Sequence, residues 1–224
     1  WCADWFDEKY FFDALTVAAR ALGRETRAVE LASYVKSLGE DLKTRAATIK
    51  NAAPPRCYIG AVSFRGRQGI ASTDSMYFPF TSTGAHNAVS EISDNSHIFL
   101  DREKLLVYDP EYIFIDAAGL EMVREDYAAN PQYFLRLSAV KNKKVYMCLP
   151  SVFYNLNIEV LYANSYFVGK IINPGAFKDI DPAAKADEIF EKFCGKKCYD
   201  EMNSEYRAFS RLEFTPDGVE IEKL

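Results

Sequence analysis

The chain has 224 residues, 49% of them hydrophobic, which is enough for a sizeable core in one domain or two. Its 27 Lys and Arg against 32 Asp and Glu leave a net charge of -5, spread along the chain without a basic block. Nucleic acid is therefore not an expected partner. No apolar run approaches the roughly 20 residues of a membrane-spanning helix, and the amino terminus shows no export signal, so we expect a soluble globular chain.

Two helices are predicted in the first quarter of the chain. The first covers Asp7 to Leu22. The second follows Gly23, covers Thr26 to Ile49, and has apolar residues at helical spacing, namely Leu31, Val35, Leu38, Leu42, Ala46 and Ile49. The segment Asn51-Ala-Ala-Pro-Pro55 ends it, because proline cannot continue the hydrogen-bond ladder.

Beyond this stop, short apolar runs alternate with helical segments. Strands are predicted at residues 57–63, 97–100, 112–116 and 145–149, and helices at residues 81–92, 159–172 and 182–193. Asp101 caps a further helix that Asp109-Pro110 ends, Ala117-Ala-Gly119 leads into another, and residues 215–218 form a turn between two short strands.

This alternation indicates parallel strand pairing with right-handed crossovers, hence an α/β, three-layer lobe with a mainly parallel sheet. Ligands of such sheets bind beyond the carboxyl ends of the strands. The loops after Val62, Ile115 and Leu149 are therefore the expected ligand face.

The five cysteines do not fix the compartment, because an odd number leaves at least one thiol unpaired. Cys57 and Cys148 lie in apolar runs and are predicted to be buried thiols. Cys194 and Cys198 lack the spacing of a zinc or thioredoxin-type pair; a local disulfide and free thiols both remain open, and no metal site is predicted.

The common catalytic signatures are absent from the sequence. There is no Gly-x-Ser-x-Gly, P-loop, Gly-x-Gly-x-x-Gly or His-Glu-x-x-His. Asp116, at the end of a strand, is the one carboxylate placed for catalysis, but helix capping is the commoner role of such a residue. We predict no catalytic residue and no enzymatic activity.

Three segments in order resemble the second lobe of the class III periplasmic binding proteins, which serve importers of ferric siderophores, haem and cobalamin. They are Asp109-Pro-Glu-Tyr-Ile-Phe-Ile-Asp116, Leu137-Ser-Ala-Val-Lys-Asn-Lys-Lys-Val-Tyr146 and Asn173-Pro-Gly-Ala-Phe177. Gly84-Ala-His-Asn87 also looks like a family element, and the likeness runs from about Phe11 to Tyr199.

In that family two lobes are joined by one long, rigid helix. The resemblance implies that residues 26–51 are this connecting helix and residues 56–224 the carboxyl-terminal ligand-binding lobe. Residues 1–25 are then a remnant of the first lobe or a leading helix, and most of the first lobe is expected to be missing from the chain.

The resemblance also selects candidate ligand-binding residues on the loops. Arg65 and Arg67 suit anionic oxygens of a chelate, although solvated loop arginines are the ordinary alternative. Tyr77 is the candidate for an aromatic wall, His86 for an axial metal ligand, and Asp116 is a candidate as a carboxylate at a strand end. The last three candidates are the loop residues Tyr154, Asn155 and Asn157, which an ordinary helix-capping turn explains almost as well.

The function that the resemblance implies is substrate binding for an ABC importer. The expected ligand is a ferric siderophore, haem or cobalamin, with no intrinsic cofactor, and the expected partner is a membrane permease. The location would be extracytoplasmic, with the full-length form secreted or lipid-anchored. A sensory or adhesive domain with the same fold is the first alternative and a chelatase-like enzyme the second, because fold does not determine function.

Overall fold

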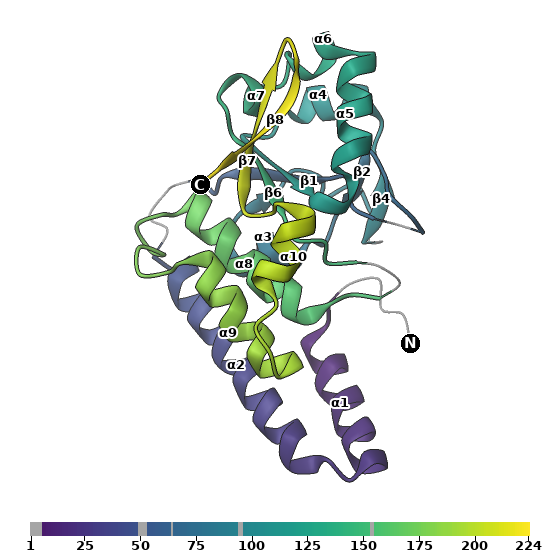
Figure 1. Ribbon diagram of the computed structural model, residues 1–224. Helices are drawn as coiled ribbons and strands as arrows, with labels where there is room; N and C mark the ends of the chain where they lie inside the picture. The colour runs from purple at the N-terminus through teal and green to yellow at the C-terminus, as the bar shows by residue number, and fades with distance from the viewer. Residues whose placement is uncertain (1–5, 49–52, 64, 94–95, 153–154) are drawn as a thin grey trace.

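A computed structural model describes residues 6–48, 53–63, 65–93, 96–152 and 155–224. Its centre is a six-stranded sheet in the order β3-β1-β5-β6-β7-β8 (Figure 1). The strands are β1 (Arg56–Gly60), β3 (His86–Asn87), β5 (Tyr112–Asp116), β6 (Val145–Cys148), β7 (Ser210–Thr215) and β8 (Gly218–Lys223). The first four in sheet order are parallel and the last two antiparallel, which confirms the predicted mainly parallel sheet.

Helices cover both faces of this sheet, as predicted for a three-layer lobe (Figure 1). One layer contains α2 (Glu25–Ala46), α3 (Phe78–Thr83), α8 (Ile158–Ile172) and α9 (Pro182–Cys194). The other contains α4 (Arg102–Tyr108), α5 (Leu120–Ala129), α6 (Pro131–Phe134) and α7 (Ser138–Lys141). Within the described ranges, no helix has both the length and the apolarity to cross a bilayer.

The remaining elements extend this framework. Helix α1 (Glu8–Leu22) packs on α2, and α10 (Tyr199–Tyr206) follows α9. A 3₁₀ turn, η1 (Ala117–Gly119), joins β5 to α5. Strands β2 (Ser72–Asp74) and β4 (His97–Phe99) form a separate antiparallel pair. The predicted cap Asp101 is confirmed at the start of α4, and the structure shows that Asp7 and Asp181 cap α1 and α9 in the same way.

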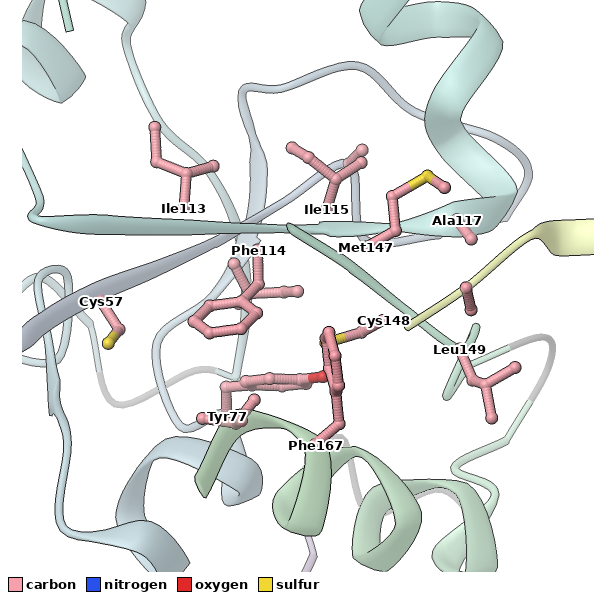
Figure 2. Close-up of a cluster of buried hydrophobic side chains, with 14 of the residues drawn as sticks. Cys57, Tyr77, Ile113, Phe114, Ile115, Ala117, Met147, Cys148, Leu149 and Phe167 are labelled. Atoms are coloured by element: carbon pink, nitrogen blue, oxygen red, sulfur yellow. The ribbon is translucent and has the colours of Figure 1, made fainter. Parts of the chain in front are cut away.

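The core lies on both faces of the central strands. Along β5, Ile113 and Ile115 point to one helix layer and Phe114 to the other, the alternation expected of a strand (Figure 2). The ring of Phe114 lies 6.4 Å from that of Phe167 on α8. Cys57 and Cys148 are fully buried thiols on this second face, as predicted, and burial raises the pKa of both.

Helix α2 confirms the predicted long helix and lies along the lobe, in contact with α3, α8 and α9. Its residues Val35, Leu38 and Leu42 are buried on the side that faces the lobe. It ends at Ala46, earlier than the predicted Ile49, because the backbone N–H of Thr48 turns back to the carbonyl of Arg45 at 3.1 Å. Residues 49–52 lie outside the described part of the chain.

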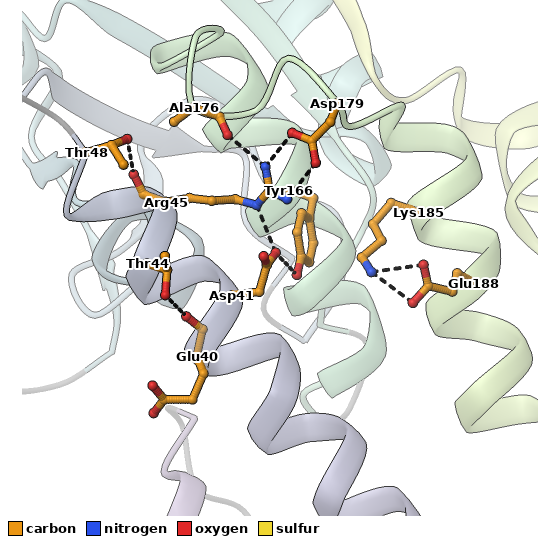
Figure 3. Close-up of polar contacts among 10 residues, drawn as sticks. All are labelled: Glu40, Asp41, Thr44, Arg45, Thr48, Tyr166, Ala176, Asp179, Lys185 and Glu188. Carbon is orange, nitrogen blue, oxygen red and sulfur yellow. Dashed lines mark hydrogen bonds and ion pairs between the residues drawn. The ribbon is translucent and has the colours of Figure 1, made fainter.

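A cluster of charged and polar side chains fixes the end of α2 to the lobe (Figure 3). Arg45 pairs with both oxygens of Asp179 at 2.7 and 2.8 Å, and with Asp41 at 2.9 Å. Its guanidinium also donates to the Ala176 carbonyl at 2.7 Å, and Tyr166 donates to Asp41 at 2.7 Å. We call these side chains the Arg45 cluster. They tie α2 to α8 and to the loop before α9.

The predicted helix over residues 81–92 is wrong. Gly84 ends α3 in the left-handed region at φ 78°, and His86 and Asn87 then pair with Arg56 and Cys57 as an edge strand. The Asn87 side chain donates to the carbonyl of Asp74 at 2.8 Å, which holds this strand in place. The strand predicted at residues 57–63 is also shorter than expected, since it ends at Gly60 and Ala61 has a φ of 61°. Strand β2 and helix α10 were not predicted.

Candidate functional site

The carboxyl ends of β1, β5 and β6 meet at one edge of the sheet, which we call the carboxyl edge. The segments that follow them are residues 61–71, 117–119 and 149–157, the loops that the sequence selected as the ligand face. Parallel pairing brings these segments together although they lie far apart in the chain. The carboxyl edge is therefore the candidate functional site.

The loop after β1 is held close to η1 by a glycine. A Cβ on Gly119 would lie 2.5 Å from the Gln68 carbonyl oxygen and 2.7 Å from that of Ala61, so only glycine permits this approach. At the other end of the loop, Asp126 accepts from the backbone N–H of Ile70 at 3.2 Å and pairs with Arg102. The loop that carries Arg65 and Arg67 is thus anchored on both sides.

Arg67 lines a pocket of about 330 Å³ between this loop, the start of α5 and the end of α10. We call it the arginine pocket, since three arginines line it. Its lining residues are Arg67, Ala117, Ala118, Leu120, Glu121, Arg124, Ser204, Glu205, Tyr206, Arg207 and Ile221. Arg65, exposed on the same loop with a φ of 51°, is not among them.

The three arginines differ in their partners. Arg124 pairs with Glu121 at 2.7 Å and donates to the Val219 carbonyl at 3.3 Å. Arg67 and Arg207 are exposed and make no ion pair with a carboxylate in the described part of the chain. Sequence reasoning missed Arg207, because it follows a helix with little apolar patterning. Two guanidinium groups in one pocket suit an anionic ligand.

Asp116 lies at the end of β5, only 3% exposed. It accepts from the backbone N–H of Ala118 at 3.0 Å and caps η1, so the capping role is confirmed. Burial raises the pKa of Asp116 to about 7, although the backbone N–H groups of Ala118 and Ser63 favour the charged form. Its burial argues against direct ligand contact.

Tyr77 lies in the core and not on the ligand face. Figure 2 shows it within the buried cluster. It is 2% exposed and accepts from the Asn164 side-chain amide at 3.3 Å. Burial raises its pKa well above the ordinary value. The prediction of Tyr77 as aromatic wall is therefore wrong, because its hydroxyl meets Asn164 inside the core and its ring packs on that of Phe80 at 4.9 Å.

His86 is at the opposite edge of the sheet. It pairs with Arg56, the first residue of β1, whereas the carboxyl edge begins after Gly60, the last. With about 3.3 Å per residue, four residues of strand separate the two by roughly 13 Å. The structure therefore does not bring His86 to the carboxyl edge, and its role as an axial ligand stays a prediction.

The loop after β6 is partly described. Tyr154 lies outside the described residues. Asn155 is exposed, and Asn157 occupies the position before α8 without making a side-chain capping hydrogen bond. Both belong to the carboxyl edge, as predicted, but neither lines the arginine pocket. Across the described ranges, no three or more His, Cys, Asp or Glu side chains converge as they would around a metal ion.

No protein-family model matches the sequence, and no curated protein matches it. Solved structures do match the fold. An ABC transporter solute binding protein from Sulfurospirillum deleyianum has a TM-score of 0.65 and 20% identity, covering 89% of this chain and 62% of that one. The molybdate-bound MolA of Haemophilus influenzae has a TM-score of 0.68 and 15% identity, covering 85% of this chain and 57% of that one. The haem binding protein HutB of Vibrio cholerae has a TM-score of 0.53 and 17% identity, covering 70% of this chain and 60% of that one.

The chain thus has the fold of the class III periplasmic binding proteins, which confirms the resemblance at the level of fold. It spans 57% to 62% of the length of these three structures. The matched part is consistent with one α/β lobe and its long helix.

Proposed function

We propose that the chain is part of the substrate-binding component of an ABC importer and binds an anionic metal chelate at its carboxyl edge. The observation that carries this proposal is the pair of exposed arginines, Arg67 and Arg207, that line one pocket without a carboxylate partner among the described residues. The fold supports the class of protein, because the solved structures that share it are periplasmic and solute-binding proteins.

The expected ligands are ferric siderophores, haem and cobalamin, and the site needs no intrinsic cofactor. A guanidinium offers several N–H donors in a planar fork that matches carboxylate, catecholate or phosphate oxygens. In the proposed mechanism the carboxyl edge supplies one wall of a cleft, a second lobe supplies the other, and α2 connects them. The loaded protein then docks on a membrane permease outside the cytoplasm. No catalytic step is part of this mechanism.

The test is a binding titration of the full-length protein against ferric siderophores, haem, cobalamin and, as a simple oxyanion, molybdate. At least one anionic chelate should bind, and the double variant Arg67→Ala, Arg207→Ala should weaken it more than about tenfold, because two charge-assisted contacts are lost. Arg136→Ala is the matched control. This exposed arginine lies between α6 and α7 and does not line the arginine pocket.

Two outcomes would contradict the proposal. If no member of the panel binds, the sensory or adhesive alternative gains support. If a chelate binds equally well to the wild type and to the double variant, the arginine pocket is not its site. A neighbouring permease and ATPase in the genome would favour transport, and fusion to a kinase or a cell-wall anchor would favour sensing.

A further inference from the structure

Two cysteine thiols flank the turn between α9 and α10. Cys194 is the last residue of α9 and is exposed, and Cys198 is the cap residue of α10 and is half-buried. The other two described cysteines, Cys57 and Cys148, are buried in the core. Among the described cysteines, only the pair that shares this short turn is thus accessible for thiol oxidation by an oxidant in the solvent.

Only residues 195–197 separate the two cysteines, and they form a turn that reverses the chain between α9 and α10. Gly195 reverses the chain in the left-handed region at φ 77°, and its N–H donates to the Glu191 carbonyl at 3.0 Å. The Cys198 thiol donates to the Lys196 carbonyl at 3.5 Å, so it points into the turn. No atom lies within 4 Å of a Cβ placed on Gly195, so the turn has room to adjust. Burial raises the pKa of Cys194, and the charges of Glu159 and Cys198 add to this effect.

The start of helix α10 is attached to the lobe through Tyr199, and Met202 and Tyr206 pack against the core further along the helix. Tyr199 is its one buried residue, with its ring stacked 5.2 Å from that of Phe209. The Tyr199 N–H donates to Asp187 on α9 at 2.9 Å. The far end of the helix carries Tyr206 and Arg207 into the arginine pocket. This far end is held separately, because the Phe209 ring stacks on Phe167 at 4.5 Å and the Phe209 N–H donates to the Met147 carbonyl at 2.8 Å.

We infer that Cys194 and Cys198 are a disulfide site, and that the bond fastens the start of α10 to the end of α9. The inference rests on the proposed extracytoplasmic role, because that compartment supplies the oxidant, a disulfide of an oxidoreductase or of glutathione. One thiolate attacks the oxidant and releases its first thiol. The second thiolate then attacks the mixed disulfide and releases the other thiol. Two S–H bonds become one S–S bond, and the oxidant becomes two thiols.

The test uses the full chain with Cys2→Ser, equilibrated with oxidised glutathione and then alkylated and digested with trypsin. Cleavage after Lys196 and Lys197 separates the two cysteines. A disulfide therefore appears as two joined peptides, lighter than their sum by two hydrogens, which separate on reduction. Cys57 and Cys148 should stay unalkylated until the protein is unfolded, which is an internal control. Cys194→Ser should abolish the joined species.

A second measurement connects the bond to α10. Oxidation should slow amide hydrogen exchange at Tyr199–Met202 by roughly threefold or more, and leave exchange in α1 unchanged. Free alkylation of both thiols after oxidation, a bond between two chains, or equal exchange in both redox states would each overturn the inference. None of these readouts uses a ligand, so a failure of the proposed transport function and a failure of the disulfide are seen separately.

Discussion

Charged side chains are used in opposite ways at two places in this lobe, the Arg45 cluster and the carboxyl edge. In the cluster, Arg45 has two carboxylate partners and a carbonyl, and it holds the pKa of Asp179 well below the usual range (Figure 3). At the carboxyl edge, Asp116 is buried and has no cation partner among the described residues, and burial raises its pKa to about 7. Arg67 and Arg207 lie there without a carboxylate partner among the described residues.

The difference separates charges that hold the fold from charges that are available to a ligand. A paired arginine gains charge-assisted hydrogen bonds within the protein and contributes to its stability. An arginine without a partner contributes little to stability and is free to gain such bonds from another molecule. The residue type alone does not reveal which case applies. The four predictions below test this contrast, beginning with the largest expected effect.

Asp116→Asn should stabilise the protein at pH 8 by roughly 3 to 4 kcal/mol, because the asparagine cannot become a buried anion. The folded-state pKa of about 7 lies above the unfolded value. The wild type therefore loses stability as pH rises from about 4 to 7, and the variant should lose less. The free energy of unfolding of the variant should still fall somewhat as pH rises, since burial also raises the pKa of Asp74 to about 6.

Urea unfolding of both proteins at pH 5 and pH 8 measures this difference. Asp217→Asn, an exposed turn residue, is the matched control and should follow the wild type at both pH values. If the free energy of unfolding changes with pH in the same way for wild type and Asp116→Asn, the charged Asp116 carboxylate is not destabilising in the folded protein. The contrast with Asp179 would then be lost.

Gly119→Ala should lower the free energy of unfolding by about 3 kcal/mol, because the added methyl meets backbone oxygens that cannot move independently. It should also weaken ligand binding, since the loop that carries Arg67 rests on this contact. Gly175→Ala is the control, because no atom lies within 4 Å of a Cβ at that position. Equal stability of the two variants would show that the loop after β1 is not held by η1.

How far the sequence predicts this molecule depends on whether a signal is local. Residues 112–115 are apolar without interruption, and Asp-Pro at residues 181–182 is a strong helix start, so β5 and α9 were found. The caps at Asp101 and Asp116 were also found, because capping depends on a few neighbouring residues. The loops of the carboxyl edge followed from strand order alone.

The failures concern contacts between distant segments. Strand β3 has two residues and exists only because β1 lies beside it, so residues 81–92 were predicted as helix. Tyr77 points inward because Asn164, 87 residues later, meets its hydroxyl. Arg207 reaches the pocket from the end of α10, a helix with one buried residue. No spacing in the sequence encodes these partners.

Arg45→Ala should destabilise the protein by about 2 kcal/mol at neutral pH, because several charge-assisted hydrogen bonds are lost and two carboxylates lose their cation. The pKa of Asp179 is lowered in the folded state, so its contribution is present above the unfolded pKa and disappears as pH falls through the lowered value. The gap between wild type and variant should therefore narrow below about pH 4. Arg45→Lys should fall between the two, because an ammonium lacks the planar fork.

The double variant Arg67→Ala, Arg207→Ala should change the free energy of unfolding by less than about 0.5 kcal/mol, because neither side chain has a carboxylate partner to lose in the described part of the chain. Replacing Arg207 by alanine does not change the backbone strain at this position, because arginine and alanine are both L-amino acids with a Cβ and the φ of 48° lies in the left-handed region. Thermal unfolding without ligand measures this, beside Arg45→Ala. A loss as large as that of Arg45→Ala would mean that the pocket arginines hold the fold, and a ligand would then have to compete with the protein for them.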